Sequence, residues 1–204
     1  MTRVIAVDAC APEPALLDEA AAVLHRGGLV AFPTESFYGL GADALEAAAV
    51  ARVFSVKGRP ETRPVLVLVD SIAMAGCLAA DLPDGVRALM ARHWPGPLTL
   101  VLTARPHVPV ALTAGSGTVG VRMPGHAVAL ALVRAAGRPL TAPSANPTGA
   151  PPPTTAAAVH AYFASAIDLI VDGGPTAGGT GSTVADCTTW PPRILRAGPI
   201  ELGP

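Results

Sequence analysis

Lys57 is the only lysine of the chain, and it lies two residues before Arg59 and six before Arg63, in the densest group of cations. An ammonium is a compact point charge and a guanidinium a planar fork, so the two are not interchangeable on a phosphate. Pro60 and Pro64 each fix a backbone dihedral and lower the entropic cost of holding these cations in place. One cation near a helix C-terminus is stabilising by about 0.3–1 kcal/mol, which does not explain three. The segment is therefore a candidate phosphate site.

The middle of the chain is also cationic. Between Asp84 and Asp168 there is no Asp or Glu, so this part of a chain of net charge −1 carries a net charge of +6. Its arginines are Arg87, Arg92, Arg105, Arg122, Arg134 and Arg138. Arginines without nearby acids concentrate the electric field in any cleft that they line, which favours an anionic ligand. We interpret positions 87, 92, 134 and 138 as solvated residues on helix surfaces, and Arg122 as a candidate ligand-binding residue.

Several segments resemble familiar sequence motifs but lack the residues or the neighbouring elements that those motifs need. The string GSGTVG, residues 115–120, matches a dinucleotide fingerprint, but VRMP follows it and indicates a strand where the fingerprint needs a helix. GGTGST, residues 178–183, lacks the lysine of a P-loop. Ser144 lies in no GxSxG segment, and the five histidines have no metal-ligand spacing. These motifs therefore predict neither a Rossmann domain, a P-loop, a serine hydrolase nor a metal site.

The composition is typical of a compact folded domain. Of the 204 residues, 50% are hydrophobic and 14% are charged, which is the opposite of a disordered composition. No uncharged apolar run reaches the roughly 18 residues of a spanning helix, and the first residues do not resemble a signal peptide. We therefore expect a cytoplasmic protein without a membrane segment. Cys10, Cys77 and Cys187 are odd in number and lack CxxC spacing, so no disulfide framework is expected.

Apolar periodicity predicts the elements that position these residues. Strands are expected at residues 3–8, 29–33, 65–69, 98–103, 118–123, 139–142, 168–172, 183–186 and 193–196. Helices are expected within 12–28, from 43 to about 57, and at 84–93, 126–136 and 155–164. Asp43 and Glu46 have capping-box spacing, so the second helix should begin at Asp43. The alternation predicts an α/β (α+β) fold with a mixed sheet, in a single domain spanning residues 1–204.

Seven blocks in order resemble a known family. They are AFPTESFYGLGADAL (31–45), KGRPETRPVLVLV (57–69), WPGPLTLVL (94–102), VGVRMPGH (119–126), LTAPSANPTGAPPPTT (140–155), GSTVADC (181–187) and ILRAGPI (194–200). In this order they are similar to the YrdC-like family of threonylcarbamoyl-AMP synthases, over about residues 10–200. The resemblance implies a twisted sheet with helices around a deep basic groove. Because the chain ends at residue 204, we expect the single-domain form of these enzymes.

The resemblance also implies a reaction, in which L-threonine, bicarbonate and ATP give threonylcarbamoyladenylate and pyrophosphate. The product supplies the threonylcarbamoyl group of a modified adenosine in tRNA, so a tRNA-modifying transferase is an expected downstream partner. Mg²⁺ is expected to arrive with ATP, held mostly by phosphate oxygens and water. Direct tRNA binding is expected to be weak or absent, since the chain has few aromatic residues and is slightly acidic.

The family's functional positions transfer to the matching residues of this chain. The resemblance implies catalytic roles for Lys57 and Arg59. It implies ATP binding by Lys57, Arg59, Arg63, Thr118, Ser144, Asn146, Thr154 and Arg196, and threonine binding by Thr34, Ser36, Arg122, Ser144 and Ser182. Ser36 occurs where relatives often have threonine, and Arg63 where others have asparagine or lysine. Asn146 before Pro147 also fits a simple turn.

Two other functions are compatible with the same residues. One is a carbamoyl-adenylating module of a carbamoyltransferase pathway, which uses a similar domain but is normally fused to further domains. The other is an RNA-binding module without turnover, which would show tight and strongly salt-dependent tRNA binding without ATP consumption.

Overall fold

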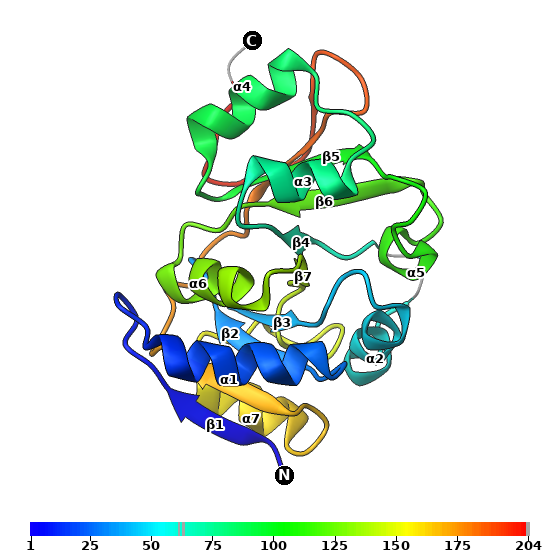
Figure 1. The fold of residues 1–204 in the computed structure, drawn as a ribbon. Helices are drawn as coiled ribbons and strands as arrows, with labels where there is room; N and C mark the ends of the chain where they lie inside the picture. The colour runs from blue at the N-terminus through cyan, green and yellow to red at the C-terminus, as the bar shows by residue number, and fades with distance from the viewer. Residues whose placement is uncertain (61, 63, 203–204) are drawn as a thin grey trace.

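The structure is a computed structural model that describes residues 1–60, 62 and 64–202 (Figure 1). Its helices are α1 (Pro14–His25), α2 (Ala47–Lys57), α3 (Ile72–Leu78), α4 (Asp84–His93), α5 (Val110–Thr113), α6 (Ala127–Ala136) and α7 (Ala156–Phe163). Its strands are β1 (Arg3–Ala6), β2 (Val30–Pro33), β3 (Tyr38–Gly41), β4 (Val67–Leu68), β5 (Leu98–Thr103), β6 (Thr118–Arg122), β7 (Leu140–Thr141), β8 (Leu169–Asp172), β9 (Thr183–Asp186) and β10 (Arg193–Arg196).

The strands form two mixed sheets that meet in the middle of the molecule. One sheet has the order β1-β8-β2-β3 and the other β10-β9-β5-β6-β4-β7. Backbone hydrogen bonds join β3 to the segment around β7, from Leu40 N–H to the Pro143 carbonyl and from Thr141 N–H to the Ala42 carbonyl. The predicted mixed α/β fold is confirmed, but the strands form two mixed sheets joined by these hydrogen bonds and not a single sheet.

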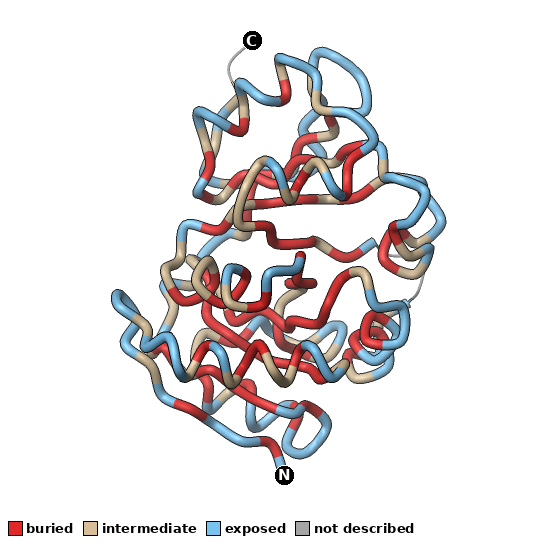
Figure 2. The backbone as a smooth tube through the Cα atoms, in the orientation of Figure 1, coloured by how far each residue is buried: buried red, intermediate tan, exposed pale blue. Residues whose placement is uncertain are grey.

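The four-stranded sheet is covered by helices on both faces (Figure 1). Val30 and Phe32 pack in one apolar cluster with α1 and α6, whereas Ala31 between them packs with α2 and α7. This alternation follows from the two-residue period of a strand, which sends neighbouring side chains to opposite faces. All four residues of β2 are buried, as expected for a strand covered on both sides (Figure 2).

The six-stranded sheet has one covered face and one face that is open to a cavity. Leu98, Leu100 and Leu102 of β5 pack under α3 and α4 in the largest apolar cluster. Thr99 and Val101, the residues between them, point to the other face and line the cavity. The alternating sequence of β5 thus separates a core face from a ligand-accessible face, and the second face forms the floor of the site.

The predicted start of α2 is wrong. The helix begins after Glu46, whose side chain accepts a hydrogen bond from the Ala48 N–H, and not at Asp43. Asp43 instead pairs with Leu140 in an isolated bridge between the sheets, and its carboxylate accepts from the Leu45 N–H and from Arg138. The end of the helix at Lys57 is confirmed, with Gly58 in the left-handed region at φ 56°.

Strand β3 and helices α3 and α5 were not predicted, whereas every predicted strand and helix occurs. Cys187 is buried, and Cys10 and Cys77 are exposed. Among the described residues, no helix combines the length and apolar character needed to cross a bilayer.

Candidate active site

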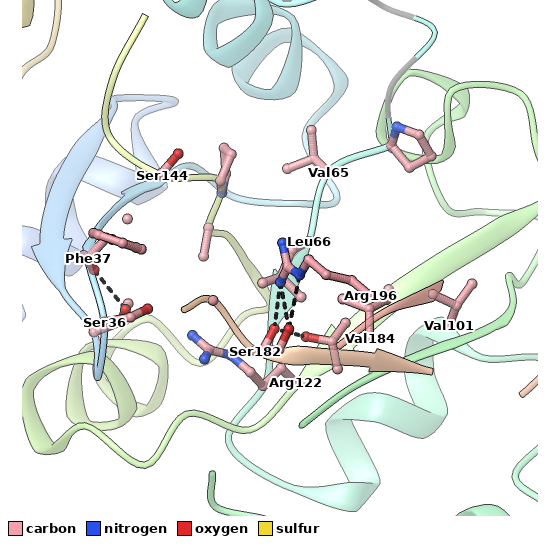
Figure 3. Close-up of a pocket in the computed structure, with 18 of the residues that line it drawn as sticks. Ser36, Phe37, Val65, Leu66, Val101, Arg122, Ser144, Ser182, Val184 and Arg196 are labelled. Atoms are coloured by element: carbon pink, nitrogen blue, oxygen red, sulfur yellow. Dashed lines mark hydrogen bonds between the residues drawn. The ribbon is translucent and has the colours of Figure 1, made fainter. Parts of the chain in front are cut away.

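A cavity of ≈ 520 Å³ lies between the open face of the six-stranded sheet and the turn that joins β2 to β3. Figure 3 shows Ser36, Phe37 and Ser144 on one side, and Val101, Val184 and Arg196 on the other. The floor comes from alternate residues of β5, β6 and β9, and the opposite wall from the β2–β3 turn and the segment after β7. Residues from both sheets therefore contribute to one site.

Eight of the twelve predicted site residues line this cavity. They are Thr34, Ser36, Arg59, Thr118, Arg122, Ser144, Ser182 and Arg196. Lys57, Asn146 and Thr154 lie outside the lining, and Arg63 lies outside the described residues.

The lining is cationic. Arg59, Arg122 and Arg196 all contribute to it, and none of the described lining residues is an Asp or Glu. Three guanidinium groups in a partly closed cavity favour a ligand with several negative oxygens, because a fork can bind a carboxylate or phosphate through two parallel N–H groups. Hydroxyl groups of Thr34, Ser36 and other lining residues add neutral donors and acceptors.

The lining residues differ in how far they are exposed. Thr34, Arg122 and Ser182 are buried, with 5%, 4% and 4% of their surface exposed. Thr118 is partly exposed, and Arg196 lies on a strand whose four residues are all exposed. Burial does not separate the two predicted sets, because Ser36 and Ser144 are half-buried like Thr118, whereas Lys57 and Asn146 are buried.

Arg122 is buried at the end of β6 beside one carboxylate. Its Nη1 lies 3.4 Å from Glu35 Oε2, and Glu35 Oε1 accepts a hydrogen bond of 2.6 Å from the Gly125 N–H. Burial lowers the pKa of Arg122, Glu35 opposes this shift, and Arg196 adds to it. The part of the sequence around Arg122 contains no acid, but Glu35 reaches the arginine from the β2–β3 turn.

Arg196 is fixed by a small polar network on the floor of the cavity. Its Nε and Nη2 donate to the Ser182 carbonyl at 3.0 and 2.8 Å, and Nη2 also lies 3.1 Å from Ser182 Oγ. Ser182 Oγ is 2.7 Å from Thr99 Oγ1. Burial lowers the pKa of Arg196. The network holds a guanidinium, two hydroxyl groups and the turn before β9 in one arrangement (Figure 3).

Lys57 does not line the cavity but lies behind it, at the C-terminus of α2. The residue is 3% exposed, and its ammonium donates to the carbonyl oxygens of Ser144 and Asn146. The Lys57 carbonyl in turn accepts from the Thr148 N–H at 2.7 Å. Burial, with a smaller contribution from Arg59, lowers the pKa of Lys57 to about 8. In this arrangement Lys57 holds the segment 144–148 against α2.

Asn146 and Thr154 lie near the segments that form the rim of the cavity. The Asn146 amide donates to the carbonyls of Pro147 and Ala150, which is the turn arrangement considered from the sequence. The Thr154 carbonyl accepts from the Thr176 N–H, and the Ser36 carbonyl accepts from the Gly178 N–H. The segment after β8 is thereby tied to Thr154 and to the β2–β3 turn.

Comparisons with known proteins are consistent with this geometry. The family model Sua5/YciO/YrdC, described as "Telomere recombination", matches residues 22–198. The chain belongs to this family. The threonylcarbamoyl-AMP synthases of Pyrococcus abyssi and Bacillus subtilis are 48% and 45% identical to it over 183 residues, 90% and 89% of this chain. The chain spans about half the length of these two relatives, 54% and 53%.

Solved structures of the Sua5/YciO/YrdC family have the same fold. The structure of P. abyssi Sua5 complexed with L-threonine superimposes with a TM-score of 0.92 at 46% identity, over 96% of this chain and 57% of that one. Escherichia coli YciO gives a TM-score of 0.89 at 24% identity, over 98% of each chain, which supports the fold alone. The resemblance seen in the seven sequence blocks is thus confirmed.

Several lining or supporting residues were not predicted, and three of them contact predicted site residues or lie between them. Thr99 bonds Ser182, Glu35 pairs with Arg122, and Gly120 lies on the floor between Thr118 and Arg122. Thr99 was a usable signal, because it is a polar residue on the face of β5 opposite the leucines, and that face had to be polar or ligand-accessible. No sequence signal paired Glu35 with Arg122.

Proposed function

We propose that this chain forms L-threonylcarbamoyladenylate and pyrophosphate from L-threonine, bicarbonate and ATP. The observation that supports this most is the cavity with three lining arginines and no lining carboxylate among the described residues. The same fold occurs in a structure complexed with L-threonine, at 46% identity. A site of this kind suits two anionic substrates, an amino acid carboxylate and a nucleotide triphosphate.

The chemistry requires positioning more than covalent catalysis. The threonine amine loses a proton and attacks the carbon of CO₂ formed from bicarbonate, which gives a carbamate. A carbamate oxygen then attacks the α-phosphorus of ATP, the bond from this phosphorus to the α,β-bridging oxygen breaks, and the β- and γ-phosphates leave as pyrophosphate. The negative charge that builds up on the α-phosphate oxygens is what fixed guanidinium groups can stabilise.

The residues divide into two groups along the cavity. In the proposed amino-acid half, Arg122 binds the threonine carboxylate, and the hydroxyl groups of Thr34, Ser36, Ser144 and Ser182 surround the side chain and amine. In the nucleotide half, Arg59, Thr118 and Arg196 bind ATP, with Ser144 between the halves. Asn146, Thr154 and Arg63 keep their predicted nucleotide roles as proposals. For Lys57, burial and two carbonyl partners favour a supporting role behind the site.

Mg²⁺ fits the site as a companion of ATP. Among the described residues no group of three or more His, Cys, Asp or Glu could hold a metal ion, and none of the described lining residues has a carboxylate. The ion would therefore be held by phosphate oxygens and water, and it would neutralise charge on the leaving pyrophosphate. We further propose a cytoplasmic location and a downstream transferase that moves the threonylcarbamoyl group to tRNA.

Pyrophosphate release by the purified protein tests the proposal. With Mg²⁺-ATP, release is expected only when L-threonine and bicarbonate are both present, and mass spectrometry should detect the adenylate. Release that requires carbamoyl phosphate in place of threonine would instead indicate the carbamoyl-adenylating module. No release, together with tight tRNA binding that weakens steeply with salt, would indicate the RNA-binding module.

A further inference from the structure

Glu35 occupies the turn between β2 and β3, and both of its neighbours in sequence, Thr34 and Ser36, line the cavity. The Glu35 side chain does not line it. Its two oxygens instead reach the end of β6 and the loop before α6, where Oε1 accepts from the Gly125 N–H at 2.6 Å and Oε2 lies 3.4 Å from Arg122 Nη1. One carboxylate therefore connects the turn that carries two hydroxyl groups to the strand that carries the buried arginine.

Arg122 needs this carboxylate for electrostatic reasons. Its side chain is 5% exposed, while that of Glu35 is 25% exposed. A guanidinium taken out of water without a counterion is strongly destabilised, and Arg196 in the same cavity makes the positive potential higher. Glu35 is the acid that opposes both effects at Arg122.

Glu35 also leaves part of the guanidinium without a hydrogen bond. Arg122 Nε is buried and has no hydrogen-bond partner within the described part of the chain, and the contact of Nη1 with Glu35 is long for a hydrogen bond. An unpaired buried donor is costly, so a fork in this state is suited to an incoming oxyanion. The carboxylate thus supports the guanidinium from behind without satisfying it.

We propose that Glu35 is a positioning residue, which acts through Arg122 to set the orientation of its fork in the amino-acid half of the cavity. The same contacts hold the Thr34 and Ser36 hydroxyl groups at a fixed distance from that fork, since Glu35 lies between these two residues. Glu35 itself touches neither substrate. This inference rests on the proposed function, in which Arg122 binds the threonine carboxylate.

Replacement of Glu35 by glutamine removes the charge but keeps the shape and the acceptor for the Gly125 N–H. For E35Q we expect the threonine KM to rise by roughly 10- to 100-fold, with kcat reduced less and the ATP KM changed by less than about threefold. E35D, which keeps the charge, should recover part of the threonine KM. The matched control is D186N, because Asp186 pairs with Arg193 at the same distance of 3.4 Å but outside the cavity; its threonine KM should be that of the wild type.

A double-mutant cycle with R122K separates positioning from a general structural effect. If Glu35 acts through Arg122, E35Q should raise the threonine KM by less than about threefold in the R122K background. Equal effects of E35Q in both backgrounds, or an unchanged threonine KM in E35Q, would overturn the inference while the proposed function stands. A wild type without threonine-dependent pyrophosphate release would overturn the proposed function, and this inference with it. If E35Q does not fold, E35D decides: a threonine KM and ATP KM that rise equally contradict positioning.

Discussion

At the scale of single residues, the lone lysine has a structural explanation. The Lys57 ammonium donates to two carbonyl oxygens in a buried position at the end of α2. A compact ammonium with three donors can satisfy two converging carbonyls, whereas the planar fork of arginine is larger and its donors are fixed in one plane. The sequence predicted a phosphate-binding role for this lysine, and it could not show that the ammonium has two backbone carbonyls as partners.

The lowered pKa of Lys57 predicts a pH dependence of stability. The folded pKa is about 8 against an ordinary 10.5, so between these values the unfolded chain binds more protons than the folded one. The free energy of unfolding contributed by Lys57 should therefore rise as the pH increases from 8 to 10.5. Urea unfolding at several pH values should show the wild type gaining stability relative to K57M across this window. A difference that does not vary with pH would contradict the lowered pKa.

At the scale of elements, the alternating residue pattern of β5 and β6 predicted both strands. The same pattern distinguishes the face that forms the cavity floor, which was not recognised from the sequence. Leucines on one face of β5 indicate the core, and Thr99 and Val101 on the other face lie on the cavity floor. Strand β3 was missed for a physical reason. A Cβ at Gly41 would lie 2.6 Å from Phe32 Cε1, so close packing requires a glycine that strand propensity disfavours.

The site residues show the same limit of sequence reasoning. Thr34, Ser36 and Ser182 could be assigned through motif resemblance, and the structure brings them together in one cavity. The pairing of Arg122 with Glu35 depends on how the β2–β3 turn meets the end of β6. Periodicity describes each element alone and contains no information about such a meeting of distant segments.

Gly120 gives a prediction at the same scale. It lies on the cavity floor in β6, its φ is not in the left-handed region, and a Cβ there would meet Thr99 Cγ2 at an ordinary 3.5 Å. Neither backbone nor packing requires glycine, so we expect that the space above it is needed by substrates. G120V should lower pyrophosphate release by roughly 100-fold or more while the melting temperature is maintained, because valine favours a strand.

The matched control for G120V is G76A on helix α3. Gly76 is outside the cavity lining, and a Cβ there would lie 3.6 Å from Leu82 Cδ1. This variant should keep wild-type activity and gain up to about 1 kcal/mol of stability. Full activity of G120V would contradict the prediction, because it would show that substrates do not need the space above residue 120.

At the scale of the whole molecule, the site depends on the joining of two sheets. The β2–β3 turn belongs to the four-stranded sheet, and β5, β6 and β9 belong to the other. The net charge of −1 gives no hint of a cavity with three lining arginines, because acids elsewhere on the surface balance them. The predicted basic groove came from the family resemblance and from the acid-free middle segment, and not from overall composition.

The difference in exposure among the lining residues has a kinetic consequence. Thr34, Arg122 and Ser182 are buried, whereas Arg196, which donates to Ser182, is exposed. With the proposed roles, a nucleotide bound by exposed Arg196 would cover the buried Ser182 beside it, so threonine must enter before ATP. A non-hydrolysable ATP analogue should then inhibit competitively against ATP and uncompetitively against threonine. Noncompetitive inhibition against threonine would mean that the two substrates reach their places independently.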